Sequence, residues 1–174
     1  NGTYGAGVYM TNGTVRNCTI RNNTNITAAM WSQLKGGGVW LSGGTLENCM
    51  IVSNTIYSAN AYSWGRGGGV YVVGSGALVR RCTIRNNMAD VPRNSSGAGI
   101  YIDSAGGTVE NCLIVQNNSL GDTANPYHRD GGAGVRMNGG MLRNCTVADN
   151  VGTNHAGCGV RQTRPWARPT SRSG

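Results

Sequence analysis

Val15-Arg16-Asn17-Cys18-Thr19-Ile20-Arg21-Asn22-Asn23 is the stretch that decides the fold. It returns at 46–54, 79–87, 109–117 and 142–150, always with an aliphatic residue three before a cysteine, Ile or Val two after it, and Asn five after it. The intervals between the five cysteines are 31, 33, 30 and 33 residues. A fixed period of this size predicts a repeat architecture in which each unit packs against its neighbours.

Composition agrees with a repeat protein. Phe is absent, aromatic residues make up 6% of the 174 residues, and Gly contributes 29 without a Gly-X-Y period. The lack of a Gly-X-Y period excludes collagen, and the chain has few aromatic residues with which to fill a compact globular core. Residues 1–160 carry eleven basic and seven acidic residues, a net charge of +4. Such a mildly basic body, without a clustered basic face, does not favour nucleic acid as a partner.

Each repeat has a first half that begins at a glycine corner, as in Gly37-Gly38-Val39-Trp40-Leu41. Its short strand alternates aliphatic, aromatic, aliphatic, which predicts two residues facing in and one facing out. The distance from the corner to the cysteine is 11 or 13 residues, and a change of two preserves the facing of the second strand. The return connections vary from 9 to 17 residues, so loops are expected on one edge.

Two or three short strands per period of about thirty residues fit one turn of a parallel β-coil. Successive coils stack at about 4.8 Å, so equivalent residues form ladders. No stretch holds a helical period for three turns, and a single helical turn is considered only for Thr27–Leu34.

The Gly-Gly-Val-Tyr type start and the Ile20-x-x-Asn23 type ending resemble the right-handed parallel β-helix repeat proteins of the pectate-lyase-like superfamily. The repeats are similar to those of polymorphic outer membrane proteins and autotransporter passengers, with Ile or Val where that signature has Phe. The resemblance covers about residues 5–160. It implies an all-β, right-handed parallel β-helix of about five to six coils, with loops on one edge.

Two ladders are expected inside the coil, one of cysteines (Cys18, Cys49, Cys82, Cys112 and Cys145) and one of asparagines (Asn23, Asn54, Asn87, Asn117 and Asn150). The thiols are interpreted as small, buried, reduced packing groups. Disulfides between coils suit parallel in-register side chains poorly, and a metal site lacks C-x-x-C or paired His partners. The asparagine amides are expected to hydrogen-bond from coil to coil.

On the outer face, the residues two before each cysteine alternate in sign: Arg16, Glu47, Arg80, Glu110 and Arg143. In-register stacking would place opposite charges about 5 Å apart, where they attract weakly in solvent. Descent from a duplicated pair of coils explains the same alternation.

Outward aromatic residues are the candidate ligand-binding groups: Tyr9, Trp40, Tyr71 and Tyr101 on the first strands, with Trp64 and Tyr127 from the loops. Aromatic rings beside polar loops can stack on sugar rings. The alternative interpretation is that these rings only close the edge of the solenoid.

The sequence offers little for catalysis. Glu47 and Glu110 are two coils apart beside arginines, and Asp122, His128 and Asp130 share one loop. No acid pair, no base beside a carboxylate and no metal cluster is recognised, so no catalytic residue and no cofactor are assigned.

After Val160 the repeat pattern fails, and 161–174 is expected to be a basic Pro/Arg/Ser tail, either disordered or a cap. The body, 1–160, is interpreted as part of a longer solenoid with no transmembrane helix. The functional hypothesis is a secreted or bacterial cell-surface β-helix segment with a structural or adhesive role that binds glycan and can associate end to end. The alternative is a non-catalytic part of a β-helix polysaccharide lyase or glycoside hydrolase.

Overall fold

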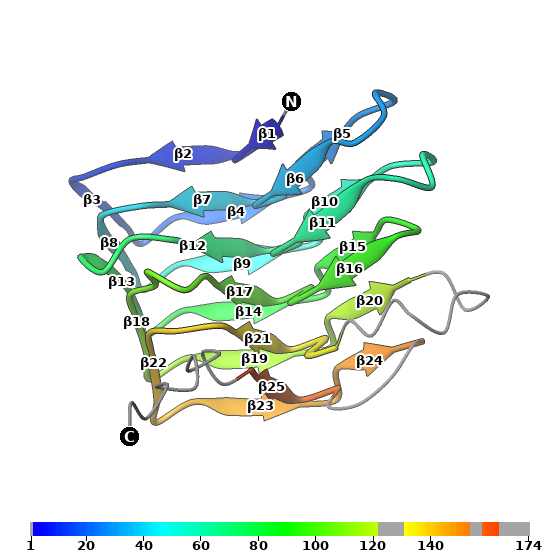
Figure 1. Ribbon diagram of the computed structural model, residues 1–174. Helices are drawn as coiled ribbons and strands as arrows, with labels where there is room; N and C mark the ends of the chain where they lie inside the picture. Colours follow the sequence, from blue (N-terminus) through cyan, green and yellow to red (C-terminus); the bar gives the residue numbers. More distant parts are fainter. Residues whose placement is uncertain (1, 122–130, 154–157, 164–174) are drawn as a thin grey trace, which may run out of the picture.

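The computed structural model describes residues 2–121, 131–153 and 158–163, which form a parallel β-solenoid of about five coils (Figure 1). Within these residues there are twenty-five short strands and no helix. The strands stack into five parallel sheets, called A to E, and each complete coil passes through them in that order.

The strands of each sheet come from successive coils. Sheet A contains β1 (Gly2–Tyr4), β6 (Gln33–Lys35), β11 (Trp64–Arg66) and β16 (Asn94–Ser96). Sheet B contains β2 (Val8–Met10), β7 (Val39–Leu41), β12 (Val70–Val72), β17 (Ile100–Ile102), β21 (Val135–Met137) and β25 (Val160–Gln162). Sheet C contains β3 (Thr14–Arg16), β8 (Gly44–Glu47), β13 (Ala77–Arg80), β18 (Thr108–Glu110) and β22 (Met141–Arg143).

The cysteine stretch supplies the other two sheets. Sheet D contains β4 (Thr19–Arg21), β9 (Met50–Val52), β14 (Thr83–Arg85), β19 (Leu113–Val115) and β23 (Thr146–Ala148). Sheet E contains β5 (Thr24–Ile26), β10 (Thr55–Tyr57), β15 (Met88–Asp90), β20 (Asn118–Leu120) and β24 (Val151–Gly152).

The expected number of two or three strands per coil was wrong, because each coil turns at two additional corners. Asn17 lies between β3 and β4 with φ 55°, and Asn22 lies between β4 and β5 with φ 57°. Equivalent positions in later coils also have positive φ, including Arg81 at 53°. A single left-handed residue bends the chain enough to start a new sheet, and Asn tolerates this conformation better than most residues.

The register confirms the predicted facing of the strands. Ile84 of sheet D pairs with Ile51 and Ile114, and all three are fully buried. Arg85, the next residue, pairs with Val52 and Val115 on the outside. Because like stacks on like, each coil adds the same apolar groups to a continuous core.

Two apolar clusters fill the interior. The larger cluster lies between sheets B, C and D, and the smaller one contains Leu34, Ile56, Ala89, Val91 and Ala98 between sheets A and E. The asparagine ladder stands near the boundary between them. A Cβ built on Gly38 would lie only 2.9 Å from Asn54 Nδ2, and the equivalent glycines of other coils face their asparagines in the same way. The last glycine of each corner therefore makes room for an asparagine side chain.

The coil-to-coil bonds expected of the asparagine ladder are confirmed. Nδ2 of Asn54 donates to Oδ1 of Asn87 at 3.0 Å, and the backbone N–H of Asn54 donates to the same oxygen at 3.0 Å. Asn87 repeats both bonds onto Asn117, and its Nδ2 also donates to the Ile51 carbonyl. Asn54, Asn87 and Asn117 are completely buried, so these bonds satisfy polar groups that water does not reach.

The cysteine ladder is confirmed as a column of free thiols, but the expectation that all five are buried was wrong. Cys49, Cys82 and Cys112 are buried, whereas Cys18 is exposed and Cys145 is partly exposed. These two lie in the first and last described coils with a cysteine, and each has a described cysteine of a neighbouring coil on one side only. Burial raises the pKa of the Cys49 thiol, which keeps it protonated.

On the outer face of sheet C, two pairs of the alternating charges form ion pairs across coils, Glu47 with Arg80 and Glu110 with Arg143. Glu47 accepts from Arg80 at 3.1 Å and from Arg81 at 3.3 Å, and Glu110 accepts from Arg143 Nε at 2.7 Å. Arg81 was not part of the predicted alternation. It occupies a corner where other coils have Asn, and so adds a second cation to Glu47.

The longer connections lie between sheets E and A, on one edge, as predicted (Figure 1). The helical turn considered for Thr27–Leu34 is absent: Gln33–Lys35 is strand β6, and the residues before it form a loop that hydrogen-bonds to the next coil. At the other end, β25 pairs with β21 through Gln162, so the ladder continues two residues past Val160. End-to-end association of copies stays a prediction.

Candidate functional site

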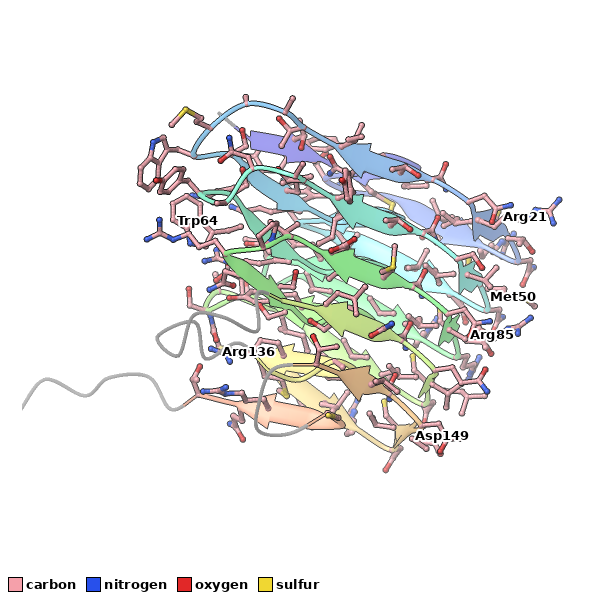
Figure 2. All side chains as sticks on the ribbon, turned by 90° about the vertical axis from the view of Figure 1, so that its right-hand side faces the viewer. Arg21, Met50, Trp64, Arg85, Arg136 and Asp149 are labelled. Atoms are coloured by element: carbon pink, nitrogen blue, oxygen red, sulfur yellow. The ribbon has the colours of Figure 1, made fainter. Side chains whose placement is uncertain are left out.

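Most of the sequence-predicted aromatic residues lie on the outward face of sheets A and B, here called the aromatic face. In sheet B, Tyr9, Trp40, Tyr71 and Tyr101 stack in register, followed by Arg136. Trp64 points outward from β11 in sheet A. Figure 2 shows Trp64 and Arg136 on the opposite side of the solenoid from Arg21 and Arg85 of sheet D. Tyr127 and His128 lie outside the described residues.

The aromatic face is open at its N-terminal end. The rings of Tyr9 and Trp40 stack with centroids 4.4 Å apart and planes 2° apart, and Tyr4 leans on Trp40 at 6.0 Å. Tyr9 is 57% exposed and Tyr4 is 45% exposed. This arrangement follows from the register. Each coil presents one outward aromatic residue in sheet B, and the distance between successive coils is close to the separation of two stacked rings.

Further along, Tyr71 and Tyr101 form a packed pair. Their ring centroids are 5.4 Å apart, yet only 1% of Tyr71 and 3% of Tyr101 is exposed. Lys35 Nζ lies 5.3 Å from the ring centre of Tyr71, and the guanidinium of Arg66 lies 5.3 Å from that of Tyr101. The two cations therefore cover the rings. In sheet B and the first strand of sheet A, the exposed rings are Tyr4 and Tyr9, and Trp40 beside them is partly exposed.

Hydrogen bonds fix the hydroxyl groups of this pair. The Tyr71 hydroxyl donates to the Asp103 carboxylate, and Nδ2 of Asn138 donates to the Tyr101 hydroxyl at 2.6 Å. Asn138 Oδ1 in turn accepts from Arg136 Nε at 3.3 Å and from Thr163 Oγ1 at 2.7 Å. Burial raises the pKa of both tyrosines, so each stays a neutral phenol.

Two titratable groups beside the pair are shifted. Burial lowers the pKa of Lys35, and the nearby Arg66 lowers it further. Burial alone would raise the pKa of Asp103, but hydrogen bonds from the Tyr71 hydroxyl and the Ser104 N–H, with Arg66 and Lys35 nearby, bring it below its usual value. Asp103 therefore remains ionised and accepts a hydrogen bond from the Tyr71 hydroxyl.

Sequence reasoning missed Lys35, Arg66, Asp103 and Asn138 as partners of the aromatic ladder. Lys35 and Arg66 stand immediately before the glycine corner in consecutive coils, and Asp103 and Asn138 follow the end of the sheet B strand in two later coils. The sequence contained two signals of these contacts. A basic residue recurs immediately before the glycine corner, and a polar residue recurs immediately after the sheet B strand.

The loops add a second aromatic group next to Trp64. Trp31 and Tyr62 come from the connections of two successive coils and stack on each other, and Trp31 also lies against Trp64. Arg93, from a third connection, lies over the rings of Trp31 and Trp64. Trp31 is 52% exposed and Tyr62 is 46% exposed. The connections that supply Trp31 and Tyr62 have equal length, but the repeat period does not determine the conformation of a loop, so this contact was not predicted.

Among the described residues, no three His, Cys, Asp or Glu side chains are grouped as metal ligands. Glu47 and Glu110 are each paired with arginine and lie in sheet C, apart from the aromatic face. The described chain also contains no helix long and apolar enough to cross a membrane. What this face offers chemically is flat apolar ring surface bordered by cations and hydrogen-bond donors.

Comparison with known proteins gives one match. A family model described as a right handed beta helix region matches residues 1–164. No curated protein and no solved structure matches the chain.

Proposed function

The chain belongs to the right-handed β-helix family, and we propose that it is a segment of an extracellular or cell-surface protein that binds a polysaccharide on its aromatic face. The fold supplies a rigid, elongated surface on which equivalent side chains repeat coil by coil. A polysaccharide is also a linear repeat, so successive sugar units can meet successive coils.

One observation carries the proposal: the exposed rings of Tyr4 and Tyr9 both lie against the partly exposed ring of Trp40 on a β-surface. Soluble proteins seldom leave large aromatic groups together in solvent without a partner. Sugar rings present C–H groups on their faces and hydroxyls on their edges. An exposed ring beside polar and cationic groups contacts both, as aromatic side chains do at binding sites.

The packed residues support the exposed ones. Tyr71 stands between Trp40 and Tyr101 in the register of sheet B, and its hydroxyl is held by Asp103. The strand of Tyr71 is thereby fixed beside the strand that carries Trp40. Tyr71 and Tyr101 thus have a supporting role in this proposal, and direct contact with sugar falls to Tyr4, Tyr9 and Trp40.

The test is affinity gel electrophoresis of the chain through a panel of neutral and acidic polysaccharides. The double variant Tyr9→Ala, Trp40→Ala should weaken binding by more than about tenfold, because an exposed aromatic in a binding site typically contributes about 2 kcal/mol. Tyr57→Ala is the matched control, since Tyr57 is an exposed aromatic of sheet E. Equal retardation of the wild type and the double variant would refute the proposal.

A further inference from the structure

The loop cluster, consisting of Trp31, Tyr62, Trp64 and Arg93, is built from the connections of three successive coils. Trp31 and Tyr62 stack with centroids 4.8 Å apart, and Trp64 is tilted against Trp31 at 5.9 Å. The guanidinium of Arg93 lies 5.2 Å from the Trp31 ring centre and 4.9 Å from that of Trp64. None of the four belongs to the predicted aromatic ladder, and Trp64 alone was a candidate ligand-binding residue from the sequence.

The backbone of Trp31 has a conformation that is unfavourable for a bulky residue. Its φ is 59°, a left-handed value that bulky residues rarely adopt. Bonds on both sides fix it: Ser63 Oγ donates to the Ala29 carbonyl at 3.3 Å, and the Trp64 N–H donates to the Ser32 carbonyl at 2.9 Å. The strained backbone presents a half-exposed indole rather than a buried one.

Arg93 decides which charge the cluster attracts. Its guanidinium covers part of two indole faces, where a cationic ligand would otherwise bind, and repels such a ligand. In the part of the chain that the structure describes, no acidic side chain forms an ion pair with Arg93. A guanidinium stacked on rings keeps its N–H donors at its edge, in the geometry that matches a carboxylate or sulfate.

The positive charge continues from the cluster onto the aromatic face. Arg66 shares strand β11 with Trp64, and Lys35 pairs with Arg66 in the register of sheet A. Asp103 is the acidic group near these cations, and it already accepts the Tyr71 hydroxyl. A chain lying across the loop cluster and the aromatic face would meet ring surfaces and cations in turn.

We propose that the loop cluster is an anion-recognising subsite for acidic saccharide units, with Arg93 binding the carboxylate or sulfate and Trp31 and Tyr62 contacting the sugar ring. This inference rests on the proposed function and adds the charge of the ligand to it. Lys35 and Arg66 supply a favourable field for the next acidic units along sheets A and B.

The experiment uses hyaluronan, polygalacturonate and alginate, each beside its carboxyl-reduced, neutral form, with affinity measured at low and moderate salt. Arg93→Gln should lower affinity for an acidic polymer about tenfold, because it removes a charge-assisted hydrogen bond to the carboxylate. It should leave affinity for the neutral form unchanged. Arg21→Gln, on the exposed surface of sheet D, is the matched control and should change neither. Trp31→Ala should weaken both forms.

The outcomes separate this inference from the proposed function. Equal binding of acidic and neutral forms, insensitive to Arg93→Gln but reduced by Tyr9→Ala, Trp40→Ala, would overturn the acidic subsite and leave polysaccharide binding standing. Equal losses in Arg21→Gln and Arg93→Gln would show that bulk charge, rather than this subsite, attracts the polymer. Failure of every probe to bind the wild type would overturn both proposals. Thermal melts of each variant identify any loss caused by unfolding.

Discussion

Asn87→Ala should destabilise the solenoid more than any single change on its surface. The Asn87 side chain makes four hydrogen bonds: its Nδ2 donates to the Ile51 carbonyl and to Asn117 Oδ1, each at 3.0 Å, and its Oδ1 accepts from the N–H and the Nδ2 of Asn54, also at 3.0 Å. Asn87 is completely buried. Alanine would remove all four bonds and leave an empty space that apolar groups do not fill.

The magnitude follows from those bonds. A buried hydrogen bond contributes about 1 kcal/mol net, and a buried donor left without a partner costs about 1–3 kcal/mol. Four lost bonds, with the Asn54 backbone N–H left unsatisfied, predict a decrease in the free energy of unfolding of at least about 4 kcal/mol. Because the ladder links coils 1 to 5, the loss should weaken the junction on both sides of the third coil.

Urea unfolding followed by circular dichroism measures the change. Asn86→Gly is the matched control: Asn86 is the preceding residue, it is exposed, and its φ of 55° suits glycine. The control should stay within about 1 kcal/mol of the wild type. Similar midpoints for Asn87→Ala and Asn86→Gly, at an unchanged slope, would refute the claim that the ladder carries this share of the stability.

Three further predictions concern facing, thiol access and pH. Ile84→Asp should cost several kcal/mol because it buries an unpaired carboxylate, whereas Arg85→Ala should change the thermal midpoint little; equal losses would contradict the assigned faces. In the native state a thiol reagent should label Cys18 rapidly, and Cys49, Cys82 and Cys112 only after unfolding, as mass spectrometry of digests would show. Asp103 has a lowered pKa in the folded state, so it contributes stability above its unfolded value of about 3.9, and this is lost as pH falls through the folded pKa. Asp103→Asn should therefore lose less stability than the wild type between about pH 5 and pH 3, and an unchanged acid profile would show that the Tyr71–Asp103 bond is unimportant.

The repeat frame could be predicted from the sequence because in-register stacking imposes one apolar pattern on every coil. The positions of Ile84, Asn87 and Tyr71 all follow from their offsets to the cysteines or to the glycine corner. The number of sheets could not be predicted from these offsets. The corners at Asn17 and Arg81 are single residues with positive φ, and neither Gly nor Pro marks them.

The candidate site, too, was predicted from the sequence only in part. The outward aromatic column was predicted from alternation, but the covering of Tyr71 by Lys35 was not, because the contact crosses both a corner and a coil boundary. The loop cluster was hidden for a different reason. Trp31 and Tyr62 belong to connections of equal length, 27–32 and 58–63, whereas Arg93 belongs to the shorter connection 91–93. Their contacts depend on loop conformation, which the repeat period does not determine.

Polysaccharide binding on the aromatic face is the central claim, and amide and indole chemical-shift mapping tests it most directly. The isotopically labelled chain would be titrated with short oligosaccharides prepared from whichever polysaccharide retards it. Binding on this face predicts that the largest shifts occur at Tyr9, Trp40 and Trp64 and their neighbours in sheets A and B, with the indole N–H signals of the two tryptophans moving together. Shifts concentrated around Arg21 and Arg85 of sheet D, with sheets A and B unchanged, would contradict it.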